Sequence, residues 1–231
     1  MEEKKQIGQL FDRIADTYDR FNHLLSLNID RRWRRKAVRL LRPADKALDV
    51  AIGTADLALE MLRQGKCSDV TGLDLSAEMM RIGQSKSERK GMQDKIKFQL
   101  GSALEMPYAE AEFDTVTCAY GVRNFADLDN GLAEMHRVLR PGGQLLILEF
   151  SYPSQPLVRK LYDLFFTHLM PLVGRVVSKD PTAYIYFRDS VKGFIWGDEM
   201  LDHIRRAGFA DTQFRTLTFG ITTIYTANKH Q

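Results

Sequence analysis

The sequence predicts an α/β fold built on a mostly parallel sheet, and two observations carry that prediction. From residue 45 onward, short apolar runs bounded by turn residues alternate with longer amphipathic stretches, as in strands joined by crossover helices. The chain has 231 residues, of which 44% are apolar and 27% charged, a composition typical of a globular protein. We therefore expect residues 1–231 to form one domain.

Five short β-rich runs are expected to form the parallel strands: 46–51, 69–74, 96–100, 113–120 and 144–150. Between them, residues 55–64 and 128–139 have the spacing of amphipathic helices, and Ser76 is placed to cap a further helix. Residues 140–143, Arg-Pro-Gly-Gly, are expected to stop the helix before the fifth strand, because proline and glycine both disfavour helix.

The pattern changes at residue 151. Residues 151–197 hold four prolines among aromatic and aliphatic side chains and show no clear strand, which predicts a mostly helical insertion. A helix over 198–207 follows, and then two β-rich runs, 209–218 and 221–227, separated by a very short turn. Such a turn pairs strands antiparallel. We therefore expect a seven-stranded, mostly parallel sheet whose last strand is antiparallel.

The formal net charge of +3 is unevenly distributed along the chain. Residues 1–42 carry 11 Lys/Arg and 6 Asp/Glu, whereas the remaining residues carry 22 and 24. The positive excess lies mainly in residues 31–42, which read as a basic helix. Such a helix suits an anionic surface, either nucleic acid or lipid head groups, and a solvated helix face is the simpler interpretation.

Cysteine and histidine usage gives no sign of a disulfide framework or a metal site. Cys67 and Cys118 are too few for either a set of disulfides or a structural zinc site, and the five histidines lack metal-ligand spacing. No secretory signal pattern opens the sequence, and no apolar run approaches the ~20 residues needed to cross a bilayer. We expect no metal and a cytoplasmic location.

The turn after the first predicted strand has features of a nucleoside-binding loop. Asp49 lies in the strand and Gly53 at the turn, so a ligand could approach the backbone and the amides of the next helix. Asp74, at the end of the second strand, is placed to accept hydrogen bonds from both ribose hydroxyls. Ser102 and Ala103 could border an adenine ring. Because the chain lacks G-x-G-x-x-G and a Walker lysine, an adenosine with little phosphate is expected, which points to S-adenosylmethionine.

Five sequence blocks, spread over essentially the whole chain, narrow the prediction. Residues 11–34 contain Phe-Asp-Arg-Ile-Ala, Tyr-Asp, Leu-Ser and Arg-Trp-Arg, and residues 48–58 read Leu-Asp-Val-Ala-Ile-Gly-Thr-Ala-Asp-Leu-Ala. Further blocks are Gly-Val-Arg-Asn-Phe at 121–125, Arg-Val-Leu-Arg-Pro-Gly-Gly at 137–143 and Leu-Glu-Phe-Ser at 148–151. In this order they resemble the UbiE family of quinone methyltransferases.

The resemblance implies a class I, Rossmann-like S-adenosylmethionine-dependent methyltransferase. Its expected substrate is a polyprenylated quinol, methylated on a ring carbon in menaquinone synthesis, ubiquinone synthesis or both; we favour demethylmenaquinol. The positions that match cofactor contacts of the family are Thr54, Asp74, Ser102, Ala103 and Ala119. Three positions depart from residues common in the family, namely Ala55, Ser102 and Ala119.

Two residues after the fourth predicted strand are the candidate catalytic groups. Arg123 and Asn124 lie where substrates meet the cofactor in such sheets, and they could stabilise a phenolate and orient a base or water. A pair that only structures the loop is the other interpretation. A deprotonated quinol hydroxyl makes the neighbouring ring carbon nucleophilic, so the substrate must be reduced. The residues expected at the quinol pocket are Tyr18, His23, Tyr120, Tyr184 and Tyr186.

These expectations divide the domain into a helical lid (1–44), a cofactor-binding half (45–150), a substrate insertion (151–197) and a final helix with a β-hairpin (198–231). The apolar side chains of residues 157–177 suit an isoprenoid tail, although a helix packed on the sheet or on a second subunit explains them equally well.

Of three alternatives to a quinol methyltransferase, one is set aside and two stay open. An Asn/Asp-Pro-Pro-aromatic motif is absent after the fourth strand, so we expect no nucleic-acid partner and interpret residues 31–42 as a peripheral membrane contact. A methyltransferase of another lipid or small molecule, and a non-catalytic cofactor- or lipid-binding subunit of a quinone-biosynthesis complex, remain the rival functions.

Overall fold

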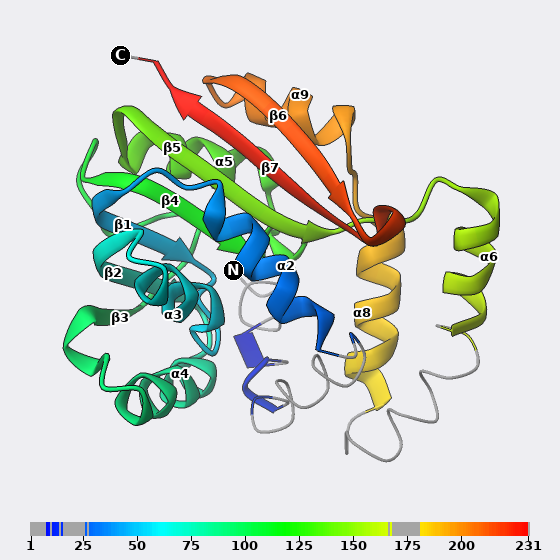
Figure 1. The fold of residues 1–231 in the computed structure, drawn as a ribbon, viewed down its shortest axis with the longest axis horizontal. Coiled ribbons are helices and arrows are strands. Elements are labelled where there is room, and N and C mark those ends of the chain that lie inside the picture. The colour runs from blue at the N-terminus through cyan, green and yellow to red at the C-terminus, as the bar shows by residue number, and fades with distance from the viewer. Residues whose placement is uncertain are drawn as a thin grey trace.

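The computed structural model describes residues 8–9, 11–13, 15, 26, 28–165, 167 and 181–230, with residues 181–185 described as backbone only. Within these residues a continuous seven-stranded sheet has the order β3-β2-β1-β4-β5-β7-β6 (Figure 1). The parallel strands are β1 (Ala44–Val50), β2 (Cys67–Asp74), β3 (Ile96–Leu100), β4 (Phe113–Ala119) and β5 (Leu139–Phe150). The predicted strands are therefore confirmed to within a few residues, except at the start of β5.

The last two strands form the predicted hairpin. β6 (Phe209–Leu217) pairs antiparallel with β7 (Thr222–Lys229), and β7 also pairs antiparallel with β5, so it lies between them. Their turn is a short 3₁₀ segment, Thr218–Gly220, in which all three residues have positive φ. This backbone leaves the Phe219 ring 72% exposed.

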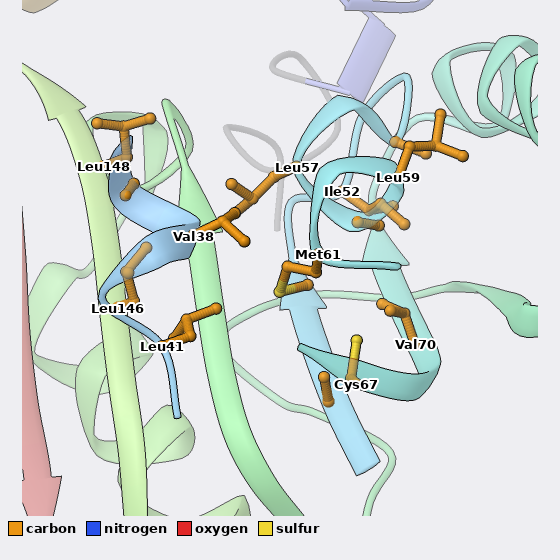
Figure 2. Close-up of a cluster of buried hydrophobic side chains, with 14 of the residues drawn as sticks. Val38, Leu41, Ile52, Leu57, Leu59, Met61, Cys67, Val70, Leu146 and Leu148 are labelled. Atoms are coloured by element: carbon orange, nitrogen blue, oxygen red, sulfur yellow. The ribbon is translucent and has the colours of Figure 1, made fainter. Parts of the chain in front are cut away.

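Helices cover both faces of the sheet. α2 (Ile29–Arg39), α3 (Asp56–Arg63) and α4 (Ala77–Arg89) lie on one face, and α5 (Leu128–Val138) and α9 (Asp198–Arg206) on the other. Figure 2 shows Val38 of α2 and Leu41 just after that helix, with Leu57 and Met61 of α3, in the core cluster on the first face. Of these helices, α3, α4 and α5 are crossovers between successive parallel strands, whereas α2 precedes β1 and α9 leads into β6.

Local sequence signals fix where the helices begin. Ser76 caps α4, since its hydroxyl accepts a hydrogen bond from the Met79 amide at 3.1 Å. Asp127 caps α5 in the same way through the Asn130 amide at 3.0 Å. The cap predicted at Ser76 is thus confirmed.

The start of β5 differs from the prediction. The helix ends at Val138, one residue before the expected end, and the strand begins at once, at Leu139, rather than at Gln144. Phe113 pairs with Leu139, and Thr115, only two residues later, pairs with Gln144. Residues 140–143 of β5 therefore form a β-bulge opposite a single residue of β4. Proline and glycine are tolerated in a strand at such a bulge, which is why the helix-stop sequence lies inside the strand.

The insertion is helical where the structure describes it. α6 (Pro156–Leu164) and α8 (Pro181–Gly193) both begin at a proline, the residue that suits the first turn of a helix. The described residues between β5 and α9 contain no strand. The division of the chain into lid, cofactor half, insertion and hairpin stays a prediction.

Candidate active site

A cleft opens at the carboxyl ends of β1, β2, β3 and β4. This is the switch point of the sheet, because the chain leaves β1 toward β2 on one side and reaches β4 on the other. The cleft encloses about 770 Å³ when the space open to solvent is counted. The predicted residues that line this cofactor cleft are Gly53, Asp74, Ser102, Ala103, Ala119, Tyr120 and Asn124.

Asp74 joins the glycine loop to the start of α4. Its carboxylate accepts hydrogen bonds from the amides of Gly53 at 2.7 Å and Ser76 at 2.9 Å. Burial raises the pKa of the Asp74 carboxyl, while the amide hydrogen bonds oppose that shift. Because a carboxylate offers about four acceptor positions, Asp74 can also accept a hydrogen bond from a ribose hydroxyl in the cleft.

The floor of the cofactor cleft requires close backbone contact. Gly53 has φ of 53°, in the left-handed region, and the flanking Ala51 and Ala55 share that conformation. At Gly121 an added Cβ would lie 2.6 Å from the Cβ of Ala51 and 2.7 Å from the Cys118 sulfur. The turns after β1 and β4 can therefore meet only because residue 121 is a glycine.

Apolar residues that sequence reasoning missed form the walls of the cofactor cleft. Leu75 and Met79 follow β2, Leu104 follows β3, and Phe125 follows β4. Such side chains flank the flat face of an adenine ring. Their position just beyond a strand end was the available signal, but residue type alone gave no reason to choose them.

The N-terminal block also reaches the cofactor cleft. Phe11 lines it, and the Asp12 carboxylate accepts a hydrogen bond of 2.6 Å from the Ser76 hydroxyl at the start of α4. Tyr18 and His23, the two lid residues predicted to face the substrate, lie outside the described residues.

Two predicted cofactor residues do not line the cleft. Asp49 is 1% exposed, and its carboxylate accepts a hydrogen bond of 2.7 Å from the Thr117 hydroxyl on β4. Burial raises the pKa of Asp49 to about 7. The Thr54 hydroxyl is also buried and accepts a hydrogen bond of 2.8 Å from the Lys86 ammonium. Because strand side chains alternate between faces, the Asp49 side chain points to the face covered by α3. There it accepts a hydrogen bond from the backbone of Ala58.

Arg123 and Asn124 share the turn after β4 but face different surroundings. Arg123 is in a buried ion pair with Glu149 at 2.9 Å, with 3% and 1% of the side chains exposed. Its guanidinium also donates to the Tyr120 carbonyl. Asn124 lines the cofactor cleft, and its side-chain oxygen accepts a hydrogen bond of 2.9 Å from the Tyr186 hydroxyl of α8. The structure thus brings Asn124 and Tyr186 together and places Arg123 behind the cleft wall.

A second, apolar groove lies beyond that wall. It encloses about 1500 Å³, including space open to solvent. Residues of α2, the end of β5, α6, α8 and the last hairpin form the groove, and its lining includes Ile29, Trp33, Phe150, Leu157, Val158, Leu161, Phe165, Phe187, Phe219 and Ile221. We call this surface the apolar groove.

An aromatic cluster separates the cofactor cleft from the apolar groove. Tyr120, which lines the cleft, stacks on Phe150, which lines the groove, with ring centroids 4.3 Å apart. Phe187 meets Phe150 edge-on at 5.1 Å, and the Arg123 guanidinium lies over both phenylalanine rings at 5.5 and 5.4 Å. Tyr184 lies on α8, and its side chain falls outside the described part of the chain.

Among the described residues, no group of three His, Cys, Asp or Glu side chains could hold a metal ion. The donor set at the cofactor cleft instead comprises one carboxylate, backbone amides and apolar walls, which fits an adenosine.

Solved structures share the fold of this chain. A S-adenosylmethionine-dependent methyltransferase from Thermotoga maritima covers 96% of this chain and 99% of its own, with a TM-score of 0.68 at 17% identity. The [4+2]-cyclase SpnF matches with a TM-score of 0.69 at 18% identity, over 98% of this chain and 97% of its own. The architecture is that of the S-adenosylmethionine-dependent methyltransferases.

Sequence comparison gives the family. The model of the ubiE/COQ5 methyltransferase family matches residues 1–229. A demethylmenaquinone methyltransferase of Bacteroides fragilis is 42% identical over 97% of this chain and 93% of its own length. A ubiquinone/menaquinone biosynthesis C-methyltransferase UbiE of Geotalea daltonii is 41% identical over 99% and 98%. The chain belongs to the ubiE/COQ5 methyltransferase family, and the resemblance found in the sequence is confirmed.

Proposed function

We propose that the chain transfers a methyl group from S-adenosylmethionine to a ring carbon of a polyprenylated quinol. The observation that carries this proposal is that the cofactor cleft and the apolar groove lie on the two sides of the Tyr120–Phe150 stack. Both relatives described above are named for menaquinone synthesis, and one for ubiquinone synthesis as well. Demethylmenaquinol is therefore the favoured acceptor, with the corresponding benzoquinol as a second one.

The residues of the cofactor cleft suit S-adenosylmethionine, which supplies an electrophilic methyl group when bound. Asp74 would hold the ribose hydroxyls, and Ser102 and Ala103 would border the adenine opposite Met79. Ala119 would contribute backbone, since its side chain carries no polar group. These contacts fix the orientation of the cofactor and leave the Tyr120–Asn124 end of the cleft for the acceptor.

At that end of the cleft, side chains of the protein would stabilise charge on the acceptor and exclude water. Arg123 would stabilise the negative charge that develops on a quinol oxygen as its proton leaves. Asn124 and Tyr186, already hydrogen-bonded to each other, would orient that oxygen or a water that accepts the proton. The Tyr120, Phe150 and Phe187 rings exclude bulk water, which strengthens the electrostatic effect.

The apolar groove would hold the isoprenoid tail. Leu157, Leu161 and Phe165 of α6 line one side, and Trp33 of α2 faces them with its ring edge-on to Phe150. A tail in this groove places the quinol ring beside the Tyr120–Phe150 stack, because ring and tail are covalently joined.

Peripheral contact with a membrane would bring the enzyme to its substrate. None of the helices in the described ranges is long and apolar enough to span a bilayer. On α6, Leu157, Leu161 and Leu164 are 72%, 58% and 56% exposed, beside the groove mouth. Such apolar exposure next to a basic helix favours an anionic lipid surface.

The basic helix α2 is only partly available for this contact. The exposed cationic side chains of α2 are Arg31, Arg32, Arg35, Lys36 and Arg39. Arg34 instead points inward, is 8% exposed and lies over the Tyr120 ring.

The exposed leucines of α6 could instead pair two copies of the chain in a homodimer, and salt distinguishes the two cases. Vesicle binding through α2 will weaken as the salt concentration rises. A dimer held by leucines will be seen in sedimentation and will not depend on salt.

The test of the proposed function is methyl transfer from labelled S-adenosylmethionine to chemically reduced demethylmenaquinone, or to its benzoquinol counterpart. The label is expected on the ring of the reduced substrate and absent when the same compound is oxidised, because a quinone ring is electrophilic. Failure to label either quinol would reject the proposal and favour another lipid acceptor or a non-catalytic subunit.

A further inference from the structure

Glu149, near the end of β5, is a buried carboxylate that the proposed reaction does not use directly. It is 0% exposed, and it is the glutamate of the Leu-Glu-Phe-Ser block. Its Oε1 accepts hydrogen bonds from Arg123 Nη1 at 2.9 Å and from the Phe150 amide at 2.8 Å, and its Oε2 accepts from the Arg123 amide at 3.3 Å. Glu149 therefore holds both the side chain and the backbone of Arg123.

These contacts place Arg123 between two surfaces of different character. On one side, the adjacent Asn124 and the Tyr120 carbonyl belong to the wall of the cofactor cleft. On the other, the guanidinium lies over Phe150 and Phe187, which line the apolar groove. The cation is thus fixed where the polar end of a tailed substrate would meet the cofactor.

A buried cation beside an apolar groove is unfavourable unless a nearby anion compensates it. Glu149 provides that charge from within the sheet, where the backbone of β5 is rigidly hydrogen-bonded to β4 and β7. The same carboxylate holds the Arg123 side chain through Nη1 and the Arg123 backbone through its amide, so both ends of the residue are tied to one anchor. A less constrained arginine could turn toward solvent and leave the junction.

We propose that Glu149 is the positioning residue of Arg123, holding its guanidinium at the junction of the cofactor cleft and the apolar groove, where the quinol oxygen loses its proton. This inference rests on the proposed function. It predicts that Glu149 affects turnover only through Arg123 and leaves cofactor binding unchanged.

The test is a double-mutant cycle on kcat. Glu149→Asp keeps the charge but withdraws it by one methylene, and we expect kcat with the reduced quinol to fall at least tenfold while the Kd for S-adenosylmethionine changes less than twofold. For the cycle itself, Glu149→Gln is expected to lower kcat at least tenfold in the wild-type background and to cause no further loss in the Arg123→Met background, since no cation remains there to be positioned. Equal loss in both backgrounds, or full kcat in Glu149→Asp, overturns the proposal.

A matched control comes from the opposite end of the sheet. Asp114 also accepts hydrogen bonds from two backbone amides, those of Asp45 and Lys46, and pairs with Arg140 at 2.6 Å. Asp114→Asn is expected to leave kcat within twofold. If Glu149→Asp does not fold by thermal melting, the double variant Arg123→Met/Glu149→Gln, which buries no charge, decides: a kcat equal to that of Arg123→Met supports the proposal and a tenfold lower one overturns it.

A readout without methyl transfer separates this inference from the proposed function. Bound 1-naphthol is expected to be more ionised than free 1-naphthol at the same pH, by the absorbance of its anion, and Glu149→Asp is expected to abolish the difference. If the wild-type chain labels no quinol yet shows this change, the proposed function fails and the positioning role stands. If ionisation is the same in both proteins, the positioning role fails.

Discussion

The cofactor cleft and the apolar groove share one wall but are built in different ways. Turns at the carboxyl ends of β1, β2, β3 and β4 form the cleft, so the sheet order determines which backbone groups meet there. The groove is formed by side chains of α2, α6 and α8 packed against the end of β5. The cleft thus depends on strand order, which a solved structure of the same fold shares at only 17% identity, whereas the groove depends on the packing of particular helices.

Replacing the residue between the two regions is expected to have the largest effect. Arg123→Met leaves Glu149 buried without its partner, so the free energy of unfolding should fall by about 3–5 kcal/mol, measured by urea denaturation. Among molecules still folded, kcat should fall by roughly 10²-fold or more, while the Kd for S-adenosylmethionine by calorimetry stays nearly unchanged. Equal losses of affinity and turnover would mean that Arg123 supports the cofactor cleft rather than the acceptor.

The buried carboxyl beneath the cleft gives a pH-dependent prediction. The pKa of Asp49 is raised from 3.8 to about 7 in the folded chain, so the protonated form is favoured there, and stability is lost as pH rises from about 4 to about 7. Asp49→Asn removes this loss. Relative to wild type, its free energy of unfolding should improve by roughly 2–4 kcal/mol between pH 4.5 and pH 8. A difference that is the same at both pH values contradicts the assignment.

Asp74 tests the cofactor side of the comparison. Asp74→Ala removes the carboxylate expected to bind the ribose, and the Kd for S-adenosylmethionine should rise roughly 10–100-fold by calorimetry, as for a hydrogen bond to a charged group. Asp69→Ala is the control, because Asp69 lies on the same strand with an exposed side chain. An unchanged Kd in Asp74→Ala would remove Asp74 from the cofactor site.

A smaller effect is expected on the acceptor side. Leu161→Ser removes an apolar side chain from the groove lining, and the KM for a prenylated quinol should rise roughly five- to tenfold, as expected for ~1–1.5 kcal/mol of lost apolar burial. A prenyl-free quinol should show no change. Leu40→Ser is the control, since Leu40 is 41% exposed on the same face of the sheet but does not line the groove. Equal effects on the two quinols would show that the groove does not bind the prenyl tail.

The strands, turns and cap around the cofactor cleft were predicted well because their signals are local. Strand ends, the Ser76 cap and the Gly53 turn each follow from a few neighbouring residues, and together they located Asp74, Ser102 and Ala103 at one cleft. The direction of the Asp49 side chain was missed, since it depends on strand register and on which face the helices cover.

The wall between the cofactor cleft and the apolar groove depends on contacts that no local pattern reveals. Glu149 lies 26 residues from Arg123 in the chain and becomes its partner only through the pairing of β4 with β5. The stack of Tyr120 on Phe150 and the link between Tyr186 and Asn124 likewise join distant segments. The bulge at residues 140–143 was also hidden, because proline and glycine signal the end of a helix and a bulged strand equally.

Whether one substrate molecule occupies both regions can be measured with a reduced demethylnaphthoquinol that carries a diazirine at the end of its prenyl tail. The chain is given S-adenosylmethionine with a labelled methyl group and irradiated after one turnover, and the labelled peptides are identified by mass spectrometry. The label is predicted on α6 or at Trp33, because under the proposed function the methylated ring would lie at the cofactor cleft and its tail in the groove that these residues line. Labelled product attached only to residues remote from the groove, such as those of α9 or β6, would contradict the assignment of the two regions to one substrate.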